Sequence, residues 1–418
     1  MTAPVPPRSG SLPLWTGRTV VLLGIILVSA SLRTAATSLA PIVDAVGKDI
    51  RLDALGLGVL GMLPPLMFAL AGLIAPRMAR VFGLEFSTIL AVVVMFLGFA
   101  ARALAPEYWM LFGGTLAALA AAGAGNVLLP PIVKRYFPDR IGLVTSIYAT
   151  AMAVGTVLPP ALAFPLADAT GWRESLGVWA LLVILSLPPW IAVLVQRRRT
   201  QRTGLQNRAP EVEEPAAGMM GQIWHSRVAW SIAIVFSIAS FQAYSLFAWL
   251  PKLLVDQVGV GSIEAGLLLA FWGLMGMVAA FVAPVIADRL GDIGWVLHVG
   301  GAGFVLGYLG LLFAPGVSPW LWIGLCGVGQ IVFPTCLALI NLRTRTQDGS
   351  IALSGFAQGV GYLIAALGPV LVGILHDLTD GWAASIILLA ATAATLGIFG
   401  IILRTPRCVE DETAAYRN

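Results

Sequence analysis

The chain has 418 residues, of which 58% are hydrophobic and 11% are charged, and its formal net charge is +4. An average soluble protein is about 25% charged, so this composition excludes a soluble globular protein and a disordered chain. Uncharged stretches such as 141–167 are apolar throughout, which also excludes the alternating strands of a transmembrane β-barrel. The sequence therefore predicts an all-α integral membrane protein. Its 46 glycines and 26 prolines are tolerated there, because neighbouring helices satisfy the backbone groups that they free.

Twelve apolar segments are long enough to cross a bilayer as helices, which takes about 20 residues each. The first, 19–40, is interrupted by Arg33, and the third, 86–101, is long enough if Arg102 reaches the interface along its aliphatic stem. The run 293–342 is too long for one helix and divides in two at a turn-forming segment with two prolines and a glycine. The other eight are uncharged runs of 22 or more residues: 54–76, 108–133, 141–167, 175–196, 228–251, 265–287, 349–376 and 381–403.

Positive charge is distributed unevenly over the loops between these segments. If the N-terminus is cytoplasmic, 19 of the 25 Lys and Arg residues fall in cytoplasmic segments and five in outer ones. The positive-inside rule therefore predicts a multi-pass protein of the cell inner membrane with both termini in the cytoplasm. The expected parts are a cytoplasmic tail, a six-helix half, a cytoplasmic linker, a second six-helix half and a second cytoplasmic tail, with the boundaries 1–18, 19–196, 197–227, 228–403 and 404–418.

The two halves repeat each other in sequence. Segment 75–83 matches segment 283–291 at four of nine positions, and 171–172 matches 381–382, both Gly-Trp. These matches join corresponding loops that lie on the same side of the membrane. A parallel repeat of this kind is the plan of large secondary transporters.

The second matching segment, which contains Asp288 and Arg289, resembles the loop signature of the major facilitator superfamily, whereas the first has Arg80 where that signature has an acid. The resemblance runs over roughly 20–400 and implies twelve helices in two halves, with Asp288, Arg289 and Arg80 gating the cytoplasmic side. Within the superfamily the chain is similar to the cyanate and 2-nitroimidazole transporters, in Lys134 and in segments 125–130, 137–138, 171–173, 249–251, 354–358 and 368–377.

Arg33 is the one charged residue inside a predicted span, and Thr37 shares its helical face one turn later. A charge at the centre of a membrane helix costs about 2.5 to 3.5 kcal/mol on insertion scales, so it marks a functional position. All 21 acidic residues fall in loops, tails or span ends, which leaves Arg33 without a predicted carboxylate partner. Its planar guanidinium suits a small oxyanion or another delocalised acceptor. The alternative is that Arg33 reaches the interface or bonds exposed carbonyls.

Further candidates are polar and aromatic residues on spans that the resemblance places around or beside a central cavity. Gln242 begins a polar stripe on span 7, and Gln358 lies in a similar stripe on span 11. The alternative is that the amides hold helices together, and for Tyr148 and Trp272 it is simple packing. With Arg33 and Thr37, the predicted substrate-binding residues are Asn126, Tyr148, Gln242, Trp272, Gln330, Gln358 and Tyr362.

We therefore predict a secondary active transporter that moves a small polar or anionic solute by alternating access and has no enzymatic activity. No residues form the pattern of a nucleophile with its base, a phosphate-binding loop or a metal site, so catalysis, a cofactor and a metal are not expected. The expected partners are the solute and membrane lipid, without nucleic acid, and the protein is expected to be a monomer. The alternatives are an exporter of small aromatic or drug-like compounds and a transporter-like receptor that binds a solute.

Overall fold

The computed structural model describes residues 18–202, 223–289, 293–345 and 347–415. Most of the predicted tail 1–18 and of the linker 197–227 lies outside these ranges. At some helix ends the backbone is described but the side chains are not, and Arg80, Asp288 and Arg289 belong to this group. The predicted gating side chains therefore lie outside the description, and their role stays a prediction.

Twelve helical segments are long and apolar enough to cross a membrane, which confirms the predicted all-α architecture. Single helices make seven spans: α4 (Ala54–Phe82), α5 (Leu84–Ala103), α6 (Tyr108–Tyr136), α7 (Ile141–Thr170), α11 (Arg227–Leu253), α12 (Ser262–Arg289) and α13 (Gly294–Phe313). Divided spans are α1 (Thr19–Ser31) with α2 (Thr34–Thr37), α8 (Trp172–Leu185) with α9 (Leu187–Arg202), α14 (Pro319–Gly329) with α15 (Val332–Leu342), α16 (Gln347–Ala365) with α17 (Leu367–Thr379), and α18 (Ala383–Ala394) with α19 (Leu396–Ile402). The remaining short elements are η1 (Ala40–Ile42), α3 (Val43–Gly47), η2 (Leu254–Val258) and α20 (Val409–Ala415).

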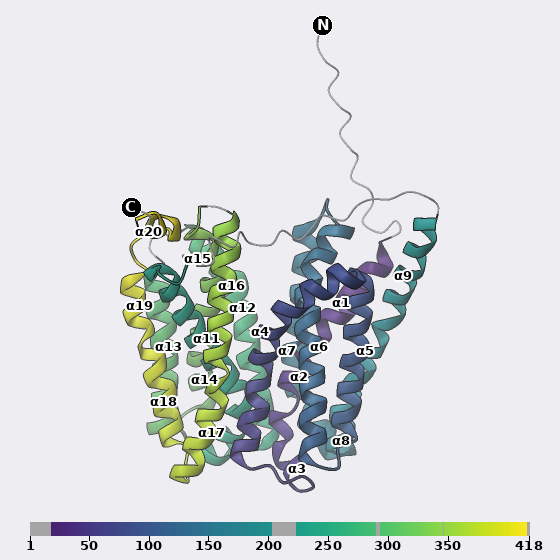
Figure 1. The fold of residues 1–418 in the computed structure, drawn as a ribbon. Helices are drawn as coiled ribbons and strands as arrows, with labels where there is room; N and C mark the ends of the chain where they lie inside the picture. The colour runs from purple at the N-terminus through teal and green to yellow at the C-terminus, as the bar shows by residue number, and fades with distance from the viewer. Residues whose placement is uncertain (1–17, 203–222, 290–292, 346, 416–418) are drawn as a thin grey trace.

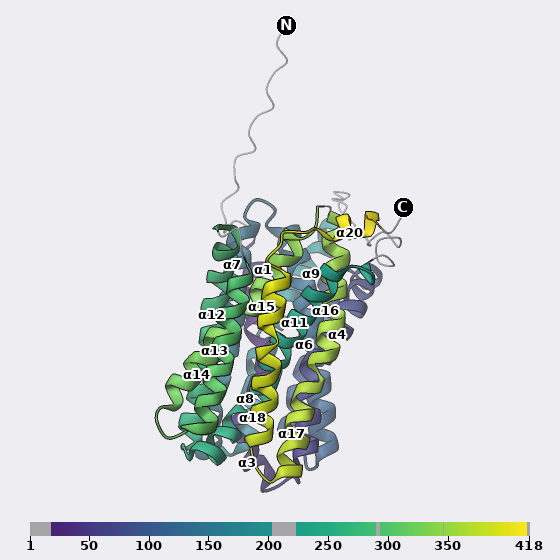
Figure 2. The same ribbon diagram turned by 90° about the vertical axis from the view of Figure 1, so that its left-hand side faces the viewer.

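The spans form two bundles that stand side by side, one from α1 to α9 and the other from α11 to α19 (Figure 1). Figure 2 shows the second bundle from its outer face, where α13 and α18 run along nearly the same direction. The start of α1 and the short helix α20 lie at the same end of the molecule, which we call the terminal side. The other end is called the opposite side.

The two halves pack against each other through α4 with α17 and through α7 with α12. A Cβ atom on Gly58 would lie 3.0 Å from the carbonyl oxygen of Pro369, and one on Gly266 would lie 2.6 Å from that of Pro160. Glycine at these positions lets the helix backbones approach closely, as is usual between membrane helices. These contacts lie toward the opposite side, whereas the two bundles diverge toward the terminal side (Figure 1).

The sequence repeat corresponds to a repeated contact on the opposite side. Trp172 Nε1 donates to Asp49 Oδ2 at 2.9 Å in the first half, and Trp382 Nε1 donates to Asp256 Oδ2 at 3.2 Å in the second. In each half, an indole at the start of the last span therefore holds a carboxylate from the end of the first span. We call these two contacts the Trp–Asp contacts.

Arg102 does not reach the interface, so the prediction for this residue was wrong. Its side chain is fully buried in α5, and Nη1 donates to the Ala35 carbonyl oxygen at 3.0 Å. Glu85, at the start of α5, is fully buried too and accepts a 2.6 Å hydrogen bond from the Tyr136 hydroxyl. Arg33 is therefore not the only charged side chain inside the protein. Local hydrogen-bonding partners stabilise Arg102 and Glu85, and a hydrophobicity pattern does not show such partners.

Candidate functional site

Arg33 stands at a break in the first span, between α1 and α2. The Leu32 amide bonds to the Ser29 carbonyl, three residues back, at 3.3 Å instead of continuing the regular helical ladder. After Arg33, α2 lasts only from Thr34 to Thr37. Breaks of this kind expose polar backbone groups near the bilayer midplane, and secondary transporters bind their solutes at such places.

The side chain of Arg33 faces the second half of the protein. Its guanidinium carbon lies 5.1 Å from the ring centroid of Phe68 on α4, a cation–π geometry. The hydroxyls of Tyr244 on α11 and Tyr362 on α16 lie close enough to interact electrostatically with its charge, and the two tyrosine ring centroids are 6.2 Å apart. Among the described residues, no carboxylate forms an ion pair with Arg33. We call Arg33, Phe68, Tyr244 and Tyr362 the Arg33 cluster.

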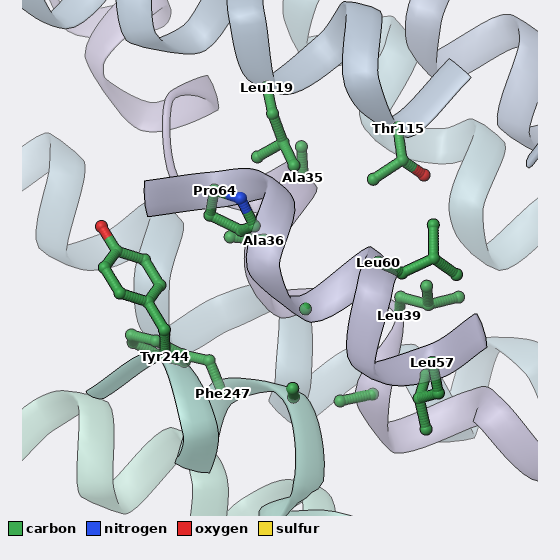
Figure 3. A pocket seen from close by; sticks show the side chains of 13 residues that line it. Ala35, Ala36, Leu39, Leu57, Leu60, Pro64, Thr115, Leu119, Tyr244 and Phe247 are labelled. Atoms are coloured by element: carbon green, nitrogen blue, oxygen red, sulfur yellow. The ribbon is translucent and has the colours of Figure 1, made fainter. Parts of the chain in front are cut away.

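A small cavity that Tyr244 helps to line adjoins the Arg33 cluster (Figure 3). Its volume is about 30 Å³, which suits water rather than a solute. Leu119 and Pro64 of the first half line it from one side, and Tyr244 and Phe247 of the second half line it from the other. Its walls are apolar except for Thr115 and the Tyr244 hydroxyl. The cavity therefore marks the seam between the two halves.

An ion pair joins the two halves on the opposite side. Lys252 Nζ lies 3.6 Å from Asp44 Oδ1 of the first half and 3.3 Å from Asp256 Oδ2 of its own half. These residues adjoin a vestibule of about 520 Å³, which His376 and Asp377 also line. With glycine-mediated packing beneath it, this ion pair closes the opposite side.

On the terminal side, the ion pairs of the described residues stay within one half. Arg18 Nη1 lies 2.5 Å from Asp139 Oδ1 in the first half, and Arg345 Nη2 lies 2.9 Å from Asp411 Oδ1 in the second. The hydrogen bond from Arg18 holds the pKa of Asp139 below its ordinary value. In the described part of the chain, the only ion pair between the halves is therefore the one on the opposite side.

Gln242 does not face the space between the halves. It is fully buried, and its Nε2 donates to the Leu389 carbonyl at 2.9 Å and to Thr392 Oγ1 at 3.0 Å. Its Oε1 accepts a 2.6 Å hydrogen bond from the Tyr308 hydroxyl. All of these partners belong to α13 and α18 of the same half, which favours the alternative that the amide joins helices, and binding of solute by Gln242 stays a prediction. Its amide holds three helices together.

Trp272 and Gln330 pack on each other. The Trp272 ring is fully buried with its centroid 4.9 Å from that of Phe247, and Nε2 of Gln330 donates to the Trp272 carbonyl. Gln330 lies at the break between α14 and α15, and its side-chain amide bonds the backbone of α12. These contacts favour the packing alternative for Trp272, whose binding role stays a prediction, and Gln330 joins α14 to α12.

Asn126 is exposed on α6. A Cβ atom on Gly123 would meet Ala71 of α4, and one on Gly125 would meet Leu32 of α1. Because successive helical residues are about 100° apart, Asn126 lies on the face between these two contacts. Its amide is therefore directed between α1 and α4; Arg33 follows directly after the end of α1, and Phe68, the aromatic ring beside it, lies on α4.

The other predicted binding residues differ in how free their polar groups are. Gln358 is half-buried and donates to Ser354 Oγ of the same helix at 2.7 Å. Tyr148 is half-buried on α7. Thr37 is buried, and its hydroxyl donates to the Arg33 carbonyl at 3.3 Å, so it supports the helix break instead of offering a group to solute.

Sequence reasoning missed Tyr244 and Phe68. Tyr244 lies two residues after Gln242, on the other side of α11, so a stripe drawn through Gln242 and Trp249 points into the second half. The available signal was the face of Tyr244 and Ala248, where a polar aromatic side chain and a small residue are one turn apart. Such a pattern is typical of a helix face that meets another half closely.

Comparisons with known proteins agree with this architecture. The sequence profile of the Major Facilitator Superfamily matches residues 22–366. An uncharacterized transporter of Bacillus subtilis (strain 168), YycB, is 31% identical over 91% of this chain and 92% of its own, and the 2-nitroimidazole transporter of Escherichia coli (strain K12) is 32% identical over 92% and 95%. The cyanate transport protein CynX of the latter organism is 24% identical over 87% and 91%. A bacterial homolog of the human lysosomal transporter Spinster has the same fold, with a TM-score of 0.68 at 16% identity over 96% of this chain and 98% of its own.

Proposed function

This chain belongs to the major facilitator superfamily and is a multi-pass membrane transporter of a small solute, and we propose that the solute is an anion or another small planar molecule with delocalised acceptor groups. The observation that carries the proposal is the Arg33 guanidinium. It sits at a helix break, faces the other half and forms no ion pair among the described residues. A guanidinium in this position has charge and paired N–H donors to offer to a solute.

Tyr244 complements Arg33 in this proposal. Its hydroxyl lies beside the Arg33 charge and the Tyr362 ring, and a tyrosine oxygen has two acceptor positions and one O–H donor. The O–H of Tyr244 is therefore available to an acceptor atom of the solute. The ring of Phe68 provides a flat apolar face beside the guanidinium, and Asn126 supplies an amide between α1 and α4.

Two relatives fit this solute chemistry. The names of the Escherichia coli proteins specify 2-nitroimidazole and cyanate. The first is a planar ring with a delocalised nitro group and the second is a small anion, and both present acceptor atoms to a guanidinium fork. We propose a solute of the same chemical kind for this chain.

Alternating access follows from how the two halves contact each other. We propose that the terminal side is cytoplasmic, as the positive-inside rule predicts, and that the chain lies in the inner membrane as a monomer. The halves are then closed toward the outside by the Lys252–Asp44 pair and by the packing of α4 on α17. They would rock about the Arg33 cluster and open the opposite side.

The test is solute uptake into proteoliposomes. We expect saturable uptake of small planar anions, loss of that uptake in Arg33→Ala, and poor rescue by Arg33→Lys, because an ammonium cannot reproduce the fork. The control is Arg173→Lys on the opposite side, which should transport normally. Undiminished uptake by a well-inserted Arg33→Ala protein would refute the role of Arg33. Preferential uptake of neutral aromatic compounds would favour the exporter, and binding without flux would favour the receptor.

A further inference from the structure

The buried arginine of the third span, Arg102, has no part in the proposed transport mechanism so far. It is 0% exposed, and its guanidinium carbon stacks 5.5 Å from the ring centroid of Phe99 on the same helix. Its Nη1 donates to the Ala35 carbonyl at 3.0 Å and its Nη2 donates to Ser38 Oγ at 3.5 Å. Both acceptors belong to the first span, on the segment that begins at Arg33.

That segment is where the first span stops being a regular helix. Because α2 ends at Thr37, the Leu39 amide does not close the next helical turn on the Ala35 carbonyl. Irregular backbone at membrane depth is tolerated only where its polar groups find partners inside the protein. The guanidinium of Arg102 donates to the Ala35 carbonyl in place of the Leu39 amide.

The same segment connects Arg33 to the seam between the halves. The cavity beside Tyr244 is lined by Ala35, Ala36, Leu39 and Ala40 of this segment, and η1 packs on α11 and α12 of the second half. A Cβ atom on Gly266 of α12 would lie 3.7 Å from Pro41 Cβ. A shift of this segment would therefore move Arg33 relative to the nearby Tyr244.

We infer that Arg102 is the positioning residue of the site: it fixes the segment from α2 to η1 and thereby aims Arg33 at the second half. Among the described residues, Arg102 makes no hydrogen bond or ring contact with the Arg33 cluster, and it acts through the segment that it holds, by way of the Ala35 carbonyl and the Ser38 hydroxyl. Its effect on solute selection rests on the proposed function of Arg33, whereas its effect on the segment does not.

The chain offers a matched control in Arg343. This arginine is 4% exposed, and its Nη2 donates to the Leu403 carbonyl at 2.6 Å, near the terminal side of the second half. Like Arg102, it is a buried guanidinium that bonds a backbone carbonyl and leaves its Nε without a partner. It differs in having no contact with the first span, so Arg343→Gln reports the general effect of losing a buried guanidinium.

The experiment compares Arg102→Gln, Arg102→Lys and Arg343→Gln in purified full-length protein. Hydrogen exchange of the amides at 33–42 should accelerate in Arg102→Gln, accelerate less in Arg102→Lys, and stay at the wild-type rate in Arg343→Gln. For uptake of a small planar anion such as nitrate into proteoliposomes, Arg102→Gln should raise the half-saturation concentration about tenfold. This is the factor expected if a displaced Arg33 loses one hydrogen bond to the anion. Arg343→Gln should lower the melting temperature and leave the half-saturation concentration unchanged.

The outcomes separate the two proposals. Unchanged exchange at 33–42 in Arg102→Gln, or equal acceleration in Arg343→Gln, would overturn the positioning role. Accelerated exchange together with uptake that does not depend on Arg33 would support the positioning role and refute the proposed solute site. If Arg102→Gln does not fold, Arg102→Lys still decides the matter, because an ammonium keeps the charge but cannot reproduce the planar fork that reaches both acceptors.

Discussion

Replacing Gln242 with leucine tests whether the buried amide stabilises the second half or binds solute. Gln242 makes three hydrogen bonds, at 2.9, 3.0 and 2.6 Å, to α18 and to the Tyr308 hydroxyl of α13. None of its partners lies in the first half. Gln242→Leu should therefore lower the stability of the second half and leave solute affinity unchanged.

The magnitude follows from the number of bonds. Interhelical hydrogen bonds in membranes contribute about 0.6 kcal/mol each on average, so losing three should cost about 2 kcal/mol. The cost rises further because the Tyr308 hydroxyl, which is fully buried, would lose its acceptor, and an unsatisfied buried group is penalised by its desolvation. Tyr308→Phe alone removes one bond and should cost less.

Thermal unfolding in detergent and solute binding should be measured on the same proteins. The double variant Gln242→Leu/Tyr308→Phe should lose less stability than the two single variants would together, because it leaves no stranded hydroxyl. Gln358→Leu is the contrasting variant, since Gln358 is half-buried and its hydrogen bond to Ser354 stays within α16. If Gln358 binds solute as predicted, this variant should weaken solute binding with little change in melting temperature.

The reasoning would be refuted by one pattern of results. If Gln242→Leu weakened solute binding while its melting temperature stayed at the wild-type value, the amide would contact solute and the hydrogen bonds to α13 and α18 would contribute little.

Three more predictions concern the contacts around the site. Tyr244→Phe should raise the half-saturation concentration about tenfold by removing one hydrogen bond from the Tyr244 hydroxyl to the solute; an unchanged value in uptake assays would argue against its role. Lys252→Ala should increase the population open on the opposite side, seen as longer spin-label distances there, and unchanged distances would contradict the closure described above. Hydrogen bonds from Trp172 and Arg173 hold the pKa of Asp49 below its ordinary value. The stabilisation from Asp49 is therefore present above that ordinary pKa and is lost as the pH falls through the lower, folded-state pKa. In a plot of melting temperature against pH, Asp49→Asn should therefore reduce the fall on the acid side.

The spans were predictable because a bilayer imposes one strong requirement on sequence, a long uncharged run. The segments from 54–76 to 381–403 could be read from that requirement alone, and each of the twelve agrees with a helical span of the structure. Arg33 was predictable for the same reason, since a charge in such a run stands out. What it faces was not, because Tyr244 and Phe68 come from distant parts of the chain.

The direction of each polar side chain was less predictable than its position. A helical wheel shows that Gln242 and Trp249 share a face, but not which neighbour that face meets, and here it meets the same half. Arg102 was misjudged for a related reason. Its burial depends on the Ala35 carbonyl, which lacks a helical partner because α2 ends at Thr37. A hydrophobicity pattern does not show which backbone carbonyls lack a partner.

The two Trp–Asp contacts differ in a way that bears on how the opposite side opens. In the first half, Asp49 is held by Arg173 at 2.6 Å within its own bundle. In the second half, the cation beside Asp256 is Lys252, which also lies 3.6 Å from Asp44 of the first half. Separating the halves would remove Asp44 from Lys252 while Asp256 stays beside it, so the ammonium keeps an anionic partner in both states. Since partly exposed ion pairs contribute only about 0 to 1 kcal/mol, this arrangement makes the closure weak enough to reverse, and the packing of α4 on α17 must supply the rest.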